Sequence, residues 1–240
     1  MRDEIQRVLD PFLAAADAAL RDRYSALLYG SAAWGGYVPG ISDINVMLIA
    51  EEVTPETLRA MDRAFAVFRK AGFPPPLFMS RAEWRRAADA FPIEITDMQS
   101  AYKLLRGPDP LEGVRVEPAD LRRALEREVR GVLMRLRQGY AAWADDEKSL
   151  SALAAESVKT VLLYLRSVLV LLGRDAPHDP PRLAVAGALA IGFPQLDLLR
   201  MVGHRGDRAW RCSADEFVRY LGVVETTARY VDELQLGDHR

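Results

Sequence analysis

The chain has 240 residues, half of them apolar, and a formal net charge of -2 with a pI near 6.0. This length can bury one large core or two modest ones, and the near-neutral balance gives no argument for nucleic-acid or membrane binding. The single cysteine, Cys212, excludes an internal disulfide and fits a reducing compartment.

Two further features favour a cytoplasmic protein with no membrane partner. The N-terminus is charged and lacks the basic start and apolar core of a signal peptide. The longest apolar run, residues 161–172, is broken by Tyr164 and Arg166, and a membrane-spanning helix needs about 20 residues. Arginine far exceeds lysine, which a GC-rich bacterial genome would explain.

The first elements in chain order alternate between helix and strand. Residues 4–21 place apolar side chains at helical spacing and predict an amphipathic helix. The apolar run 24–29 predicts a buried strand, and the glycines and prolines of residues 30–42 predict a loop. Residues 44–50 predict a second strand. Thr54 and Pro55 then predict a helix that continues to about residue 71.

The next segment continues the alternation. Residues 77–79 predict a short strand, and Ser80 with Glu83 forms a capping-box pattern that starts a helix to about residue 90. Residues 91–98 predict a fourth strand. Such alternation is typical of an α/β sheet.

After residue 107 only helical patterns remain. They predict two long helices over 121–143 and 150–172, then shorter helices near 182–191, 194–203 and 213–234. We therefore expect an α/β (α+β) domain with a mixed sheet and flanking helices over residues 1–115. An all-α helical bundle domain is expected over residues 116–240.

The glycine loop and its flanks carry the chemistry. They read Leu28-Tyr29-Gly30-Ser31, then eleven residues, then Asp43-Ile44-Asn45-Val46. This resembles the signature of the nucleotidyltransferase superfamily, which includes aminoglycoside nucleotidyltransferases and minimal nucleotidyltransferases of toxin–antitoxin pairs. The spacing also makes physical sense. A glycine at a strand end lets the backbone approach a phosphate, and residues two apart on a strand face the same side.

The resemblance implies the roles of these residues. Gly30 and Ser31 would hold phosphate, and Asp43 with Asn45 would bind Mg²⁺ or Mn²⁺ through oxygen ligands. A third carboxylate on a neighbouring strand normally completes such a site. Glu94 is favoured because it lies mid-strand between apolar residues, with Asp97 as the alternative on the opposite face.

Asn45 departs from the family pattern, which has Asp or Glu at this position. An amide oxygen carries no charge and attracts a dication more weakly than a carboxylate does. The helical half resembles the helical domain that follows the catalytic domain in aminoglycoside-type enzymes. By that resemblance a basic side chain could reach the triphosphate; Lys159, Arg166 and Lys103 are candidates, and spacing singles out none.

Together these features predict a metal-dependent nucleotidyltransferase. It would move a nucleoside monophosphate from ATP, or another nucleoside triphosphate, to a hydroxyl of a small molecule or protein that the sequence does not identify. Asp43 and Glu94 would be catalytic, and Lys159 would help to bind the nucleotide. The alternative is a catalytically degenerate nucleotide-binding or interaction module, motivated by Asn45, or an antitoxin-like partner.

Overall fold

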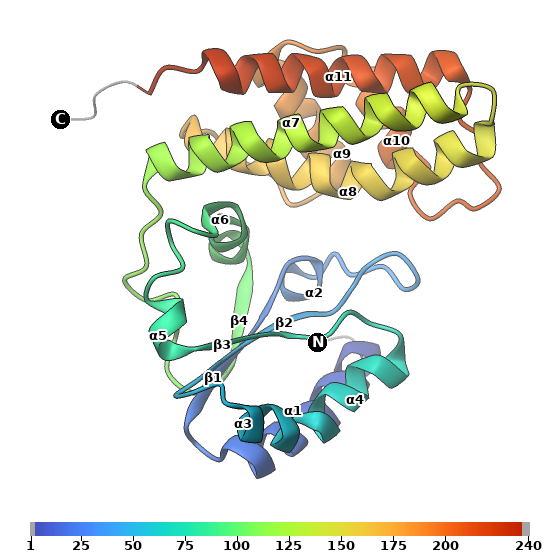
Figure 1. Ribbon diagram of the computed structural model, residues 1–240. Helices are drawn as coiled ribbons and strands as arrows, with labels where there is room; N and C mark the ends of the chain where they lie inside the picture. Colours follow the sequence, from blue (N-terminus) through green and yellow to red (C-terminus); the bar gives the residue numbers. More distant parts are fainter. Residues whose placement is uncertain (1–2, 237–240) are drawn as a thin grey trace. The chain divides into compact units, whose positions relative to one another are not determined.

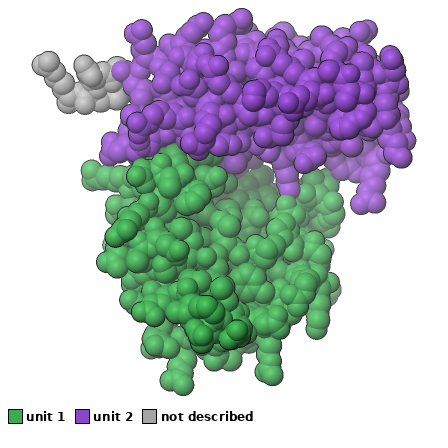
Figure 2. Space-filling model, in the orientation of Figure 1, with its two compact units in different colours: residues 1–116 green, residues 117–240 purple. Residues whose placement is uncertain are grey.

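The computed structural model describes residues 3–236 and divides into two compact units, residues 1–116 and 117–240 (Figure 2). The first unit is a mixed α and β structure. Its elements are α1 (Asp3–Leu20), β1 (Tyr24–Tyr29), α2 (Ser31–Trp34), β2 (Asn45–Ala50), α3 (Pro55–Ala60), α4 (Asp62–Ala71), β3 (Leu77–Ser80), α5 (Arg81–Trp84), α6 (Pro92–Ser100) and β4 (Tyr102–Arg106).

The four strands form one mixed sheet in the order β3-β2-β1-β4. β1 is antiparallel to both β2 and β4, whereas β2 and β3 are parallel (Figure 1). The register of β1 against β2 places Tyr29 opposite Asn45, so the end of β1 and the start of β2 lie together. This confirms the expected mixed sheet with flanking helices.

Alternate residues of the central strands pack into two separate hydrophobic cores, one on each face of the sheet. Ala26 and Leu28 of β1 pack with residues of α1 and α4 on one face. Leu27 of β1 and Met47 of β2 pack on the other face, with residues of α5 and α6. Successive side chains along a strand therefore alternate between the face covered by α1 and α4 and the face covered by α5 and α6.

The helix-capping residues predicted from the sequence do cap helices in the structure. Thr54 caps α3 by accepting a hydrogen bond from the Thr57 N–H at 3.2 Å. Ser80 and Glu83 form the capping box of α5. Two lengths differ from expectation, because the predicted helix over 55–71 is interrupted at Met61 and α5 ends at Trp84.

The predicted strand over residues 91–98 is wrong. This segment forms α6, with Pro92 in its first turn, and the fourth strand is β4 further along the chain. Proline is favoured in the first turn of a helix, where its missing N–H has no intrahelical partner in any case. Glu94 and Asp97 are therefore three residues apart on a helix, which makes them neighbours rather than residues on opposite faces.

The second unit is helical throughout its described elements: α7 (Pro118–Trp143), α8 (Glu147–Leu171), α9 (Pro180–Ile191), α10 (Gln195–Gly203) and α11 (Ala214–Glu233). The long helices α7, α8 and α11 contact one another, and α9 and α10 pack on each other and on α8 (Figure 1). Ser213 and Glu216 form the capping box that starts α11.

Charged pairs reinforce the contact between α7 and α11. Arg137 donates to Glu225 at 2.7 Å, and Arg130 donates to Asp232. Because these side chains are exposed, screening by solvent keeps both contributions small. Across residues 3–236, no helix is both long enough and apolar enough to cross a membrane.

Candidate active site around Gly30 and Asp43

Gly30 makes the turn that follows β1. Its backbone has φ 70° and ψ −150°, a conformation that is essentially restricted to glycine. Its N–H donates to the carbonyl of Ala101 at 3.1 Å, and its own carbonyl accepts from Ala33 at 2.9 Å. A Cβ on this residue would lie 3.2 Å from Nδ2 of Asn45. The turn thus brings the Gly30 backbone directly beside Asn45.

A short turn sets the position of Asp43. The N–H groups of Ile41 and Ser42 donate to the Val38 carbonyl at 3.1 and 2.8 Å, and Ser42 Oγ accepts from the Val38 N–H at 3.0 Å. Gly40 adopts φ 76° within this turn. The chain enters β2 directly afterwards, so Asp43 lies between a closed turn and the start of the strand.

Asn45 begins β2, and Asp43 lies two residues before it, outside the strand. Ile44, between them, is 1% exposed and packs in the core with α1 and α4. Asn45, the first residue of β2, alternates with Val46 and therefore faces the side of the sheet that α5 and α6 cover. Asp43 and Asn45 are both half-buried. That these two side chains share a face stays a prediction.

Two tyrosines near this end of the sheet have pKa values raised by burial and by nearby carboxylates. Burial raises the pKa of Tyr29 to about 12, assisted by the negative charges of Asp97 and Glu94. Burial also raises the pKa of Tyr37, assisted by the charges of Glu4 and Asp43. Both hydroxyls therefore keep their protons at neutral pH and can donate hydrogen bonds. The Tyr29 shift further indicates that the α6 carboxylates lie within electrostatic range of the end of β1.

The two α6 carboxylates differ in exposure. Glu94 is exposed and Asp97 is half-buried, and α6 packs its buried residues against the sheet face that carries Asn45. Glu94 is therefore not a buried carboxylate in the middle of a strand. That prediction is wrong because the segment is a helix. Sequence reasoning also missed Tyr29, although this residue stands immediately before Gly30 and its register partner is Asn45.

The three basic candidates have different environments. Lys103 is exposed on β4, and Lys159 is exposed on α8 of the second unit. Arg166 is only 8% exposed, and its Nη1 donates to the carbonyls of Ala176 and Pro177 at 3.1 and 3.2 Å. Arg166 thus anchors the segment between α8 and α9, rather than being a solvated surface charge.

A divalent ion at this site would need hard oxygen donors. Within residues 3–236, no group of three or more His, Cys, Asp or Glu side chains is placed to hold a metal. Asp43 and Asn45 supply two hard oxygen donors two residues apart in the sequence. Mg²⁺ is commonly held by one or two carboxylates together with substrate phosphates. The arrangement therefore fits an ion whose coordination a nucleotide completes.

Comparison with known proteins supports the fold. No family model matches the chain, and no curated protein sequence matches it. Among solved structures, it is similar to spectinomycin adenyltransferase AAD(9) from Enterococcus faecialis, which was crystallised with ATP and spectinomycin. The TM-score is 0.62 at 13% sequence identity, over 94% of this chain and 98% of that one. The chain has a nucleotidyltransferase fold.

Proposed function

We propose that this chain transfers a nucleoside monophosphate from ATP to a hydroxyl group of a small molecule. The observation that carries the proposal is the position of Asp43 and Asn45. Asn45 begins β2 beside the turn at Gly30, and Asp43 precedes it by two residues. The similar structure was solved with ATP and a small molecule, which is consistent with a nucleotide and an acceptor on this fold.

Each residue has a defined part in this proposal. The backbone at Gly30 and the hydroxyl of Ser31 bind phosphate oxygens, since a glycine with no Cβ permits close approach. Asp43 and the carbonyl oxygen of Asn45 hold Mg²⁺ or Mn²⁺. The ion would neutralise charge on the transferring phosphate, which is the main requirement of this chemistry.

A carboxylate on α6 would act as the general base for the acceptor hydroxyl. Such a base must lie within hydrogen-bond reach of the proton that it removes. We retain Glu94 for this role, because its exposed side chain is accessible to an acceptor, and Asp97 is its alternative.

Calorimetric titration of ATP with Mg²⁺ tests the site. The wild type should bind in a metal-dependent manner, and Asp43→Ala should weaken binding by about tenfold or more, since a charged ligand is removed. Asp22→Ala is the matched control, because Asp22 is an exposed aspartate before β1. Equal binding by wild type and Asp43→Ala would contradict the metal-binding role of Asp43.

Transfer is tested separately with α-labelled ATP and a panel of hydroxylated small molecules. Asp43→Asn should abolish the appearance of labelled product, and undiminished transfer would exclude the metal role. Asn45 supports a second candidate, a nucleotide-binding module without turnover. Metal-dependent ATP binding with no labelled product on any acceptor, including water, would favour that second candidate.

A further inference from the structure

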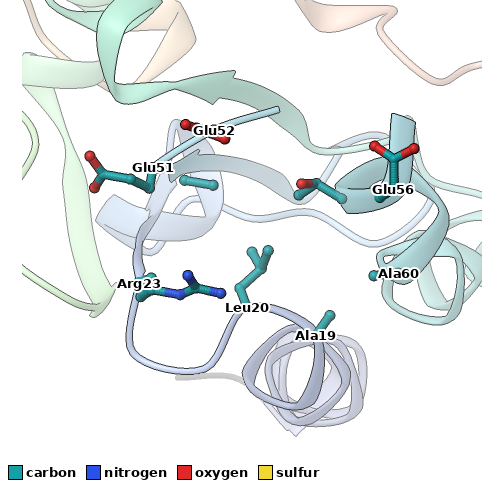
Figure 3. A pocket seen from close by; sticks show the side chains of 9 residues that line it. Ala19, Leu20, Arg23, Glu51, Glu52, Glu56 and Ala60 are labelled. Carbon is teal, nitrogen blue, oxygen red and sulfur yellow. The ribbon is translucent and has the colours of Figure 1, made fainter. Parts of the chain in front are cut away.

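A pocket of about 420 Å³ lies in the first unit, away from the Gly30 turn. Its walls come from the end of α1, the residue before β1, the end of β2 and helix α3. Small apolar groups form part of the lining, including Leu20, Ala50 and Ala60 (Figure 3). The volume falls within the range of about 300–1,000 Å³ that is usual for small-molecule sites.

Charges of both signs line this pocket. Figure 3 shows Arg23 and Glu51 on one side, and Glu56 on α3 on the other. Glu51 pairs with Arg81, whose Nε lies 3.3 Å from its carboxylate. In the described part of the chain, Arg23, Glu52 and Glu56 form no ion pair. The pocket therefore presents an available guanidinium and two available carboxylates, with apolar groups on part of its wall.

The pocket is distinct from the proposed nucleotide site. Asp43 and Asn45 lie at the start of β2, whereas Ala50 and Glu51 lie at its end. The two ends of this six-residue strand are roughly 17 Å apart at a rise of about 3.3 Å per residue. No residue of the Gly30 turn lines the pocket.

We propose that this pocket binds a small zwitterion, an amine joined to a carboxylate, of the size of a dipeptide. Arg23 would bind the carboxylate, since a guanidinium fits a carboxylate with two parallel hydrogen bonds. Glu52 and Glu56 would bind the ammonium group. A small apolar side chain would rest on Leu20 and Ala60. A nucleotide is a poor fit, because its phosphates would face the two unpaired glutamates.

The test uses the dipeptide glycyl-leucine and its two blocked forms. N-acetyl-glycyl-leucine lacks the ammonium, and glycyl-leucinamide lacks the carboxylate. Each is titrated into ¹⁵N-labelled full-length protein and followed by backbone amide shifts. The free dipeptide should shift the amides of Leu20, Ala50 and Ala60. Each blocked form should bind about tenfold more weakly, because one charge-assisted contact is lost.

Substitutions assign the two charges. Arg23→Met should reduce the preference for the free dipeptide over the amide, and Glu56→Gln should reduce its preference over the acetylated form. Arg59→Met and Glu112→Gln remove exposed charges outside the pocket and should change neither preference. Asp43→Ala should bind the dipeptide like the wild type, which separates this proposal from the proposed transfer activity. Absent shifts, shifts elsewhere, or equal binding of all three compounds would overturn it.

Discussion

Gly30 and Asn45 meet where β1 ends and β2 begins, since a Cβ on Gly30 would lie 3.2 Å from Nδ2 of Asn45. The register of the two strands enforces this approach, because the preceding residue, Tyr29, is the partner of Asn45. The side chain at position 45 and the turn that is proposed to bind phosphate therefore form one local unit. A change at either residue should affect the other.

Gly30→Ala should destabilise the first unit more than an ordinary glycine substitution. The residue has φ 70° and ψ −150°, where a Cβ costs about 1–3 kcal/mol, and the contact with Asn45 adds to this. Gly72→Ala is the control, because Gly72 has φ 76° and ψ 17° with nothing within 4 Å. Urea unfolding should show a loss larger by about 1 kcal/mol for Gly30→Ala. Equal losses of stability would mean that the contact between the added Cβ and Asn45 costs nothing.

Asn45→Asp should strengthen the binding of a divalent ion. It would place a second carboxylate two residues from Asp43. Without metal, repulsion between the carboxylates should lower the melting temperature slightly, and Mg²⁺ should restore it. Asp43→Asn combined with Asn45→Asp is the control, because it keeps a single carboxylate. A melting temperature of Asn45→Asp that does not respond to Mg²⁺ would count against the proposed ligand geometry.

Local signals made much of the fold predictable. Thr54 with Pro55, and the pairs Ser80–Glu83 and Ser213–Glu216, place a hydrogen-bonding side chain where a helix has free N–H groups. These signals depend on neighbours within a few residues, so they can be read without tertiary information. The Gly30 to Asn45 spacing is similarly local, and the structure places both residues at one end of the sheet.

The third carboxylate was harder to predict because α6 lacks a clear helical pattern. Ile93, Ile95 and Thr96 are β-branched and all buried, so the segment has the composition of a strand and little exposed face. Tertiary packing against the sheet overrides that preference. Pro92 was the available signal, since proline is common in the first turn of a helix and rare inside a central strand.

A hydrogen-bonded cluster between α1, β1 and β4 gives a pH-dependent prediction. Tyr24 donates to Asp17 at 2.6 Å, and Arg106 donates to the same carboxylate at 3.2 Å. Burial raises the Asp17 pKa, but these hydrogen bonds outweigh burial and hold it below its ordinary value. The stabilisation is therefore present above about pH 4 and is lost as the pH falls through the lowered pKa.

The substitution Tyr24→Phe tests whether this stabilisation is lost as the pH falls. At about pH 7 it should reduce the protection of β1 amides from hydrogen exchange by about 1 kcal/mol, and the difference should shrink below about pH 3. Tyr140→Phe is the control, because the ring of Tyr140 stacks on Phe217 and its replacement keeps that contact. A difference between Tyr24→Phe and wild type that grows as the pH falls would contradict the assignment.

In the second unit, Arg166 anchors the segment that precedes α9. It is 8% exposed, and its Nη1 donates to the carbonyls of Ala176 and Pro177 and lies 3.1 Å from Nδ1 of His178. Arg166→Met would leave these acceptors without their donor and should cost about 2–3 kcal/mol.

The loss should be concentrated in the segment before α9. Hydrogen exchange of residues 173–179 should accelerate more than that of α7. Arg166→Lys should restore only part of the protection, because an ammonium group lacks the planar fork of a guanidinium. Arg174→Met removes an exposed arginine from the same segment and should leave exchange unchanged. If Arg166→Met and Arg174→Met gave the same exchange rates, the anchoring role of Arg166 would be excluded.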